Sequence, residues 1–229
     1  MSAEPTPKTP PSLPAGRVEF VLFDCDGVLV DSEVLSIEVD RQMLAEVGWD
    51  LTLEEITERF VGRSHAYYLD EVERHLGHPP PQGWAEQTDQ RYWAAYRKDL
   101  KPVDGIIAAL DRITLPTCVA SSGSHEKMRL TLGLTGLWDR FAGRIFSATE
   151  VEHGKPAPDL FLHAAGSLGW DPTACVVVED APYGVQAGLA AGMHVIAYAG
   201  GVNPARVLAA PGVVIITDMH DLPDAIASI

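Results

Sequence analysis

The sequence predicts an α/β fold: a doubly wound, Rossmann-like parallel sheet that carries an inserted α-helical domain. Two observations lead to this prediction. Apolar, β-rich runs alternate with helical segments through the second half of the chain, which is typical of a parallel sheet covered by helices on both faces. The stretch from residue 33 to residue 101, by contrast, contains helical patterns only. With 46% hydrophobic and 21% charged residues, the 229-residue chain can bury a sizeable core.

Ordered structure is expected to begin with the apolar run Val18–Phe23, which predicts the first strand. Residues 1–17 hold five prolines and few large hydrophobic residues, so we predict a disordered, proline-rich tail. Apolar residues then recur at near-helical spacing in four segments, and Gly48 is placed to end the first of them. We therefore divide the chain into the tail, a core of residues 18–32 and 102–229, and a helical insertion of residues 33–101.

The rest of the core is expected to alternate between strands and helices. The predicted strands are Thr117–Ala120, Arg144–Phe146, Cys175–Val178, Val195–Ala197 and Val213–Ile216. The predicted helices between them are Gly105–Arg112, Ser124–Leu132, Asp159–Leu168 and Tyr183–Ala191. In sheets of this kind, ligands bind beyond the carboxyl ends of the strands, which is where functional residues are to be sought.

Composition excludes several classes of function. Seventeen basic against thirty-two acidic residues give a net charge of −15, which disfavours binding to nucleic acid or to an anionic membrane surface. The three cysteines are odd in number and far apart, so they form neither a disulfide framework nor a zinc pattern. No apolar run is long enough to span a bilayer, and the N-terminus lacks a signal-peptide pattern. These features predict a cytoplasmic protein.

Two carboxylates follow the first predicted strand. Asp24 and Asp26 stand two residues apart, so in extended backbone both side chains face the same crevice. Cys25 between them is expected to point the other way, as a small buried hydrophobic residue. Like charges this close require either a cation between them or a proton on one of them.

Polar residues also follow the later strands. The run Ser121–Ser124 offers hydroxyls and free N–H groups at the start of a helix, which suits a phosphate. Lys155 lies in a proline-flanked loop, and the pair Glu179-Asp180 supplies the hard oxygen ligands that Mg²⁺ prefers. Each feature alone is also explained by a helix cap, a solvated lysine or an acidic turn. Together, each at a strand end, they indicate Mg²⁺-dependent phosphoryl transfer.

These motifs resemble those of the haloacid dehalogenase superfamily, and the resemblance covers the chain from Val18 onward. The four segments that carry it are Phe23–Ser32, Ala120–Ser122, Gly154–Pro156 and Val178–Ala181. The helical insertion between the first two is similar to the α-helical cap of the branch that contains β-phosphoglucomutases and many sugar-phosphate phosphatases. In that branch the cap determines substrate specificity.

The resemblance implies a role for each residue. Asp24 would attack phosphorus and form an aspartyl-phosphate. Asp26 would protonate the leaving alcohol and then deprotonate the hydrolytic water. Ser121 and Lys155 would hold the phosphoryl oxygens. The implied Mg²⁺ ligands are Asp24, Asp26 (through its backbone carbonyl), Glu179 and Asp180.

Substrate-binding candidates lie in two places. Ser122 belongs to the hydroxyl run, and His125 and Lys127, at the start of the helix after it, either line the same entrance or are solvated. In the insertion, the resemblance points to the loop formed by Gly62, Arg63, Ser64 and His65. Arg63 in this loop either binds a carboxylate or a second phosphate of the substrate through two parallel hydrogen bonds, or is a solvated residue at a helix start. The aromatic residues Trp84, Trp93 and Tyr96 are expected to belong to the core of the insertion.

The residues favour a phosphatase over other chemistries of the family. Dehalogenases lack the second aspartate, which Asp26 supplies here. Phosphonate-cleaving relatives need a cap lysine, and the insertion has only Lys98 and Lys101, at its end. The main alternative is a β-phosphoglucomutase-type mutase.

Mutases keep a histidine where this chain has Ser36, a lysine where it has Val61, and an arginine where it has His65. Those groups hold the second phosphate of a bisphosphate and suppress hydrolysis. We therefore expect a phosphatase that acts on small phosphorylated metabolites, most naturally sugar or sugar-acid phosphates, as a monomer or dimer. A non-catalytic regulatory protein on the same fold is a further alternative, which the complete set of site residues disfavours.

Overall fold

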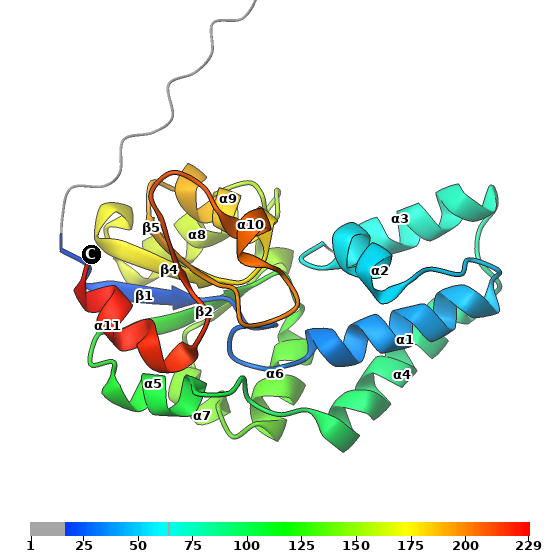
Figure 1. Cartoon of the computed structure of the whole chain (residues 1–229), viewed down its shortest axis with the longest axis horizontal. Coiled ribbons are helices and arrows are strands. Elements are labelled where there is room, and N and C mark those ends of the chain that lie inside the picture. The colour runs from blue at the N-terminus through cyan, green and yellow to red at the C-terminus, as the bar shows by residue number, and fades with distance from the viewer. Residues whose placement is uncertain (1–16, 64) are drawn as a thin grey trace, which may run out of the picture.

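The computed structural model describes residues 17–63 and 65–229. The predicted tail, apart from Arg17, lies outside these residues. Within the described chain, six strands form one parallel sheet with helices on both faces, and a group of four helices lies to one side of it (Figure 1). The predicted α/β fold with a doubly wound sheet is confirmed.

The six strands of the sheet lie in the order β3-β2-β1-β4-β5-β6. Their bounds are β1 Phe20–Phe23, β2 Thr117–Ser121, β3 Ile145–Ser147, β4 Cys175–Glu179, β5 His194–Tyr198 and β6 Val213–Ile216. All the pairings are parallel. Because β1 is central and its neighbours β2 and β4 come from different parts of the chain, the strand order reverses at β1. This switch point is where a doubly wound sheet opens a crevice for a ligand.

Side chains of β1 alternate between two buried layers, as a strand covered on both faces requires. Val21 and Phe23 pack in one hydrophobic cluster, and Leu22 packs in another on the opposite face. The first cluster is completed by the helices α5 Ile106–Arg112, α6 His125–Leu134, α7 Trp138–Phe141 and α11 Leu222–Ala227. The second is completed by α8 Asp159–Leu168 and α9 Pro182–Ala190. The short helix α10, Ala205–Leu208, covers the β5–β6 end of the sheet.

The four helices between the first two strands form a unit that we call the helical insert. They are α1 Glu33–Glu46, α2 Leu53–Phe60, α3 His65–Leu76 and α4 Trp84–Asp99. They surround their own hydrophobic cluster, in which Trp49, Phe60 and Trp84 are buried. Gly48, at a φ of 81°, follows the first helix, and a capping box at Thr52 begins the second. The insert therefore has a core of its own beside the sheet.

The structure differs from the sequence prediction in two respects. The short helices α7, α10 and α11 had no clear periodic signal, since each is only four to six residues long. Trp84 belongs to the core of the insert as expected, but Trp93 and Tyr96 are not members of that hydrophobic cluster and line a cavity instead. None of the described helices combines the length and the apolar character needed to cross a membrane.

Candidate active site

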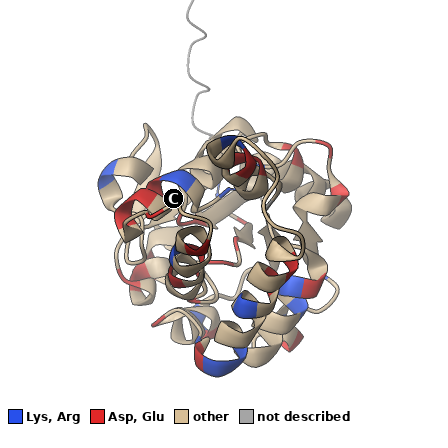
Figure 2. Ribbon diagram, turned by 90° about the vertical axis from the view of Figure 1, so that its right-hand side faces the viewer, with Lys and Arg blue, Asp and Glu red and all other residues tan. Residues whose placement is uncertain are grey.

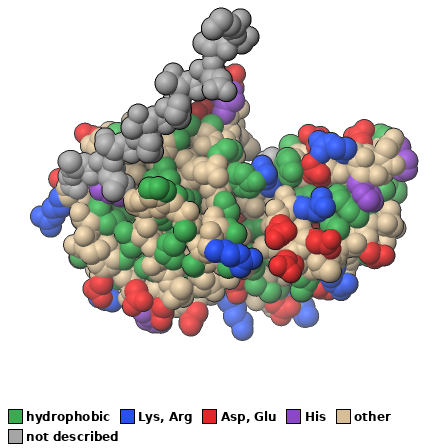
Figure 3. Space-filling view, turned by 45° about the horizontal axis from the view of Figure 1, so that its top comes forward, with side chains coloured by type: hydrophobic (Ala, Val, Ile, Leu, Met, Phe, Trp, Pro, Cys, Tyr) green, Lys and Arg blue, Asp and Glu red, His purple; other side chains and the backbone are tan. Residues whose placement is uncertain are grey.

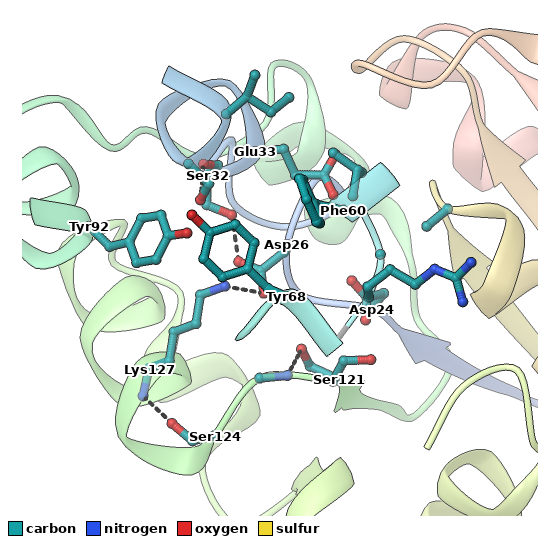
Figure 4. A pocket seen from close by; sticks show the side chains of 18 of the residues that line it. Asp24, Asp26, Ser32, Glu33, Phe60, Tyr68, Tyr92, Ser121, Ser124 and Lys127 are labelled. Atoms are coloured by element: carbon teal, nitrogen blue, oxygen red, sulfur yellow. Dashed lines mark hydrogen bonds and ion pairs between the residues drawn. The ribbon is translucent and has the colours of Figure 1, made fainter. Parts of the chain in front are cut away.

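A cavity of about 430 Å³ lies between the carboxyl ends of the strands and the helical insert. Core residues Asp24, Asp26, Ser121, Lys155 and Asp180 line one side of it. The insert contributes aromatic and acidic side chains to the other side, among them Asp40, Tyr68, Tyr92, Trp93 and Tyr96. Figure 4 shows the two carboxylates of the first motif facing this space, with Ser121 below them.

Lys155 joins two buried carboxylates at the centre of the site. Its Nζ lies 2.5 Å from Asp24 Oδ1 and 2.6 Å from Glu179 Oε1, and it donates to the Ala120 carbonyl at 3.2 Å. Burial alone would lower the pKa of Lys155, but the two carboxylates raise it above its usual value. The lysine therefore stays charged and holds the Asp24 carboxylate in one direction.

Three acidic side chains form a cluster that fits a divalent cation. Oxygens of Asp24, Glu179 and Asp180 lie within 4.8 Å of one another, and all three residues are buried. Burial, assisted by the charges of Glu179 and Asp26, raises the pKa of Asp24 to about 7. Burial, together with Glu33 and Glu179, raises the pKa of Asp180 well above its usual value. Lys155 contacts the other two carboxylates, whereas Oδ2 of Asp180 is buried without a hydrogen-bond donor, so this side of the cluster fits the positive charge that Mg²⁺ would supply.

Asp26 is held through both of its carboxylate oxygens. Ser32 Oγ donates to Oδ1 at 2.5 Å, and Lys127 Nζ lies 2.9 Å from Oδ2. Burial would raise the pKa of Asp26, but Lys127 and Ser32 outweigh it and lower the pKa below its usual value. These two contacts favour the ionised form of Asp26.

The hydroxyl run begins at the end of β2. Ser121 is buried, and its Oγ accepts from the Gly123 N–H at 3.1 Å. Ser124 caps α6 by accepting from the Lys127 N–H at 3.2 Å. Ser121, Ser122 and Gly123 all line the cavity next to Asp24. This arrangement offers small hydroxyl groups and a helix start to an anion.

The loop of the insert reaches the core beside the fourth motif. Gly62, at a φ of 77°, comes so close to Ala181 that an added Cβ would lie 2.7 Å from the alanine Cβ. The Arg63 guanidinium stacks on the rings of Tyr183 and Tyr67, at 3.6 Å and 4.6 Å from their centroids, and donates to the Tyr183 hydroxyl. Both Gly62 and Arg63 line the cavity. This arginine contacts core and cavity together, so it is not simply a solvated residue.

Two further residues of that loop are not placed. Ser64 lies outside the described residues, and of His65 only the backbone at the start of α3 is described. Their suggested part in substrate binding stays a prediction.

The structure does not bring His125 into the cavity. Its ring is exposed and pairs with Glu150 at 2.6 Å, on the outside of the α6 N-terminus. Lys127, two positions further along the helix, lines the cavity, as does Glu126 between them, whereas His125 does not. The structure thus places His125 outside the cavity, contrary to its expected place beside the substrate.

Sequence reasoning did not assign several residues of the site. Glu33 lines the cavity, and burial, with the neighbouring carboxylates, raises its pKa to about 8. Its position directly after the first motif was the available signal. Asp40 and Tyr96 had no motif around them, since their place in the site depends on how the insert packs against the core.

Asp40 is a buried carboxyl group of the insert, and its ionisation should destabilise the folded protein. It is 6% exposed and accepts from Tyr92, and burial raises its pKa from 3.8 to about 7. The folded protein thus binds this proton more tightly than the unfolded chain, so the stability contribution of Asp40 falls as pH rises from about 4 to 7 and is constant above. Asp40→Asn cannot ionise. It should stabilise the fold by roughly 2–4 kcal/mol at pH 8, and by about half of that or less at pH 5.

Urea unfolding of the wild type and of Asp40→Asn at both pH values measures this difference. Asp50→Asn, an exposed position of the insert, is the matched control and should show no pH-dependent gain. Equal gains for Asp40→Asn at the two pH values would contradict the interpretation.

Charges elsewhere on the molecule are mixed. Acidic and basic positions both occur on the helices that face the viewer in Figure 2, and both signs occur on the face shown in Figure 3. Among the described residues that line the cavity, Arg63, Lys127 and Lys155 are basic and lie in the same cavity as its carboxylates.

Comparison with known proteins agrees with this geometry. The family model of haloacid dehalogenase-like hydrolases matches residues 18–192. The 6-phosphogluconate phosphatase of Escherichia coli (strain K12) is 32% identical over 209 residues, which cover 91% of this chain and 94% of that protein. Hexitol phosphatase A of the same organism is 34% identical over 194 residues, 79% of this chain and 83% of that one.

Among solved structures, a conserved haloacid dehalogenase-like protein of unknown function from Agrobacterium tumefaciens superposes with a TM-score of 0.81. It is 36% identical, and the match covers 92% of this chain and 98% of that one. Both curated relatives named above are phosphatases, which agrees with the prediction of a phosphoric monoester hydrolase. The motifs, the sheet order and the family match lead to one conclusion: the chain belongs to the haloacid dehalogenase-like hydrolases.

Proposed function

We propose that this protein is a Mg²⁺-dependent phosphatase of small phosphorylated metabolites, sugar or sugar-acid phosphates, and that it acts through an aspartyl-phosphate. The observation that supports this most directly is the Asp24 carboxylate, which Lys155 holds at 2.5 Å beside the Glu179–Asp180 pair and at the edge of the cavity. The relatives named 6-phosphogluconate phosphatase and hexitol phosphatase support the substrate class.

In this mechanism an oxygen of Asp24 attacks phosphorus, and the bond to the leaving alkoxide breaks as the protonated form of Asp26 gives that oxygen its proton. Asp26 then takes a proton from water, which attacks the same phosphorus and releases Asp24. Ser121 and Lys155 hold the phosphoryl oxygens throughout. Mg²⁺, when bound, would neutralise charge on the phosphoryl group and on the nucleophile. The residues that would hold it are Asp24, Glu179, Asp180 and the backbone carbonyl of Asp26.

We further propose that residues 33–101 act as a cap over a catalytic core of residues 18–32 and 102–229. The contact of Gly62 and Arg63 with Ala181 and Tyr183 supports this division, because it brings the insert directly onto the fourth motif. A cap in this position would exclude bulk water during phosphoryl transfer and select the leaving group. Gly62, Arg63, Ser64 and His65 are then the specificity loop, with Ser122 on the core side.

Phosphate release from a panel of sugar, sugar-acid and nucleotide monophosphates tests the proposal. We expect release that requires added Mg²⁺, is abolished by EDTA and is restored by excess Mg²⁺. The melting temperature should also rise with Mg²⁺, and further with Mg²⁺ plus inorganic phosphate, because ligands that bind only the folded state stabilise it. Equal activity with EDTA would contradict the metal requirement. Absence of release across the panel would contradict the phosphatase.

The mutase alternative is tested in the same panel. β-Glucose 1-phosphate with a trace of the bisphosphate should give phosphate rather than an isomer, since Ser36 is bound to the Tyr96 hydroxyl at 2.7 Å in the place where mutases keep a histidine. Isomerisation without phosphate release would identify a mutase instead.

A further inference from the structure

Lys127 contacts the proposed acid/base residue but belongs to none of the motifs. We propose that Lys127 is a positioning residue for Asp26: its ammonium group fixes the carboxylate in the direction from which it deprotonates the water that hydrolyses the aspartyl-phosphate. This inference rests on the proposed function and assigns to that site a residue that the motifs do not contain.

The Asp26 carboxylate is held by one donor on each of its oxygens. Lys127 Nζ lies 2.9 Å from Oδ2, and Ser32 Oγ lies 2.5 Å from Oδ1 (Figure 4). An ionised carboxylate offers about four lone-pair positions, so two remain for a proton from water. With one donor on each oxygen, the carboxyl plane cannot rotate without losing a charge-assisted hydrogen bond.

Lys127, Ser121 and Asp26 converge on the backbone of Gly123. A Cβ placed on Gly123 would lie 3.4 Å from Lys127 Cδ, 3.5 Å from Ser121 Oγ and 3.6 Å from Asp26 Oδ2. The lysine stem, the hydroxyl and the carboxylate therefore converge on one point, at the backbone of the hydroxyl run. Lys127 thus orients Asp26 next to the groups proposed to hold the phosphoryl oxygens.

Lys127 is itself fixed from both sides of the cavity. In the core, its backbone N–H donates to the Oγ of Ser124, the N-cap of α6. From the insert, the Tyr96 ring lies 5.8 Å from its Nζ, and the Tyr96 hydroxyl is 2.7 Å from Ser36 Oγ. A lysine held in this way can act as a fixed support, whereas a mobile surface lysine could not.

Removing Lys127 should slow hydrolysis of the aspartyl-phosphate and leave its formation from an aryl phosphate unchanged. In hydrolysis, the water oxygen bonds to phosphorus, Asp26 takes the water proton, and the bond from phosphorus to Asp24 breaks with its electron pair returning to Asp24. Formation of the aspartyl-phosphate from an aryl phosphate needs no proton from Asp26, since a nitrophenolate leaves without one. A misdirected Asp26 should therefore slow the second step alone, and the phosphoenzyme should accumulate.

p-Nitrophenyl phosphate with Mg²⁺ is the probe. For Lys127→Met we expect kcat to fall about 10²-fold, KM to fall in parallel and kcat/KM to stay within about threefold of the wild type. Rapid mixing should show a burst of one nitrophenolate per enzyme before the slow steady state. Lys127→Arg, which keeps a cation near Asp26, should recover most of kcat and lose the burst. Lys98→Met, at a side chain 80% exposed in the insert, is the matched control and should behave as wild type.

The other outcomes overturn the inference in distinguishable ways. A higher KM with a lower kcat/KM would mean that Lys127 binds the phosphoryl group itself. A lower kcat at unchanged KM, with no burst and a lower melting temperature, would mean that Lys127 only stabilises the fold. Wild-type kinetics in Lys127→Met would leave it no role at Asp26. If the wild type itself releases no nitrophenolate in an Asp24-dependent manner, the proposed function fails, and this inference fails with it.

Discussion

Asp24→Asn is expected to reduce phosphate release by about 10⁴-fold or more, the scale on which loss of a nucleophile acts in other hydrolases. An asparagine amide cannot form the aspartyl-phosphate, and the neighbouring Glu179 does not take its place, because Lys155 and two backbone N–H groups already hold it. The measurement is a single-turnover phosphate assay on the best substrate of the panel, with Mg²⁺ at saturation.

The same variant should fold at least as well as the wild type. The pKa of Asp24, raised by burial to about 7, indicates that its ionised form is costly in the folded protein. The amide removes that charge, while Lys155 keeps Glu179 as a partner at 2.6 Å. We therefore expect an unchanged or higher melting temperature together with the lost activity, as when a functional group is retained at the expense of stability.

Asp139→Asn, at an exposed position of α7, is the control and should leave both quantities unchanged. Appreciable turnover by Asp24→Asn would refute the covalent mechanism. Lost activity together with a strongly lowered melting temperature would instead mean that Asp24 is required for folding.

The residues of the site that could be predicted from sequence are those attached directly to strand ends. Asp24 follows β1, Ser121 ends β2 and Glu179 ends β4, and these three strands are neighbours in the sheet. Periodicity and apolar runs locate such strands, and parallel packing then brings their carboxyl ends to one edge. The core fold could be predicted for the same reason.

Residues whose place depends on packing between separate units could not be predicted. Arg63 reaches Tyr183 because a loop of the insert rests on the start of α9, and Tyr96 approaches Lys127 because α4 of the insert packs against α6. The sequence pattern gives the helices but not the angle at which the insert meets the core. The placement of His125 outside the cavity has a related origin at a smaller scale, since its side chain points outward while Glu126 and Lys127, one and two positions further along α6, line the cavity.

A second large effect is expected from Gly184, a residue of α9 that carries no functional group. A Cβ at this position would lie 1.7 Å from Glu179 Oε1, 1.9 Å from its carboxyl carbon and 2.5 Å from Oε2. Gly184→Ala must therefore displace the carboxylate from Lys155 and from the N–H groups of Asp180 and Ala181, each 2.9 Å from Oε2. A shift of this size at a reacting centre should lower kcat/KM by roughly 10²-fold or more. It should also weaken the Mg²⁺ dependence of the melting temperature.

Alanine normally stabilises a helix relative to glycine by roughly 0.5–1 kcal/mol, so the sign of the stability change is itself diagnostic. Gly166→Ala in α8, where an added Cβ meets nothing within 4 Å, should show that ordinary gain with full activity. Gly184→Ala should instead lower the free energy of unfolding by about 1–3 kcal/mol through overpacking.

Glu179→Asp, which shortens the side chain by one methylene, should relieve the clash with the alanine at position 184. The double variant should then be less impaired than the sum of the two single changes. Strict additivity in this cycle would contradict the interpretation that the alanine at position 184 acts by contacting Glu179.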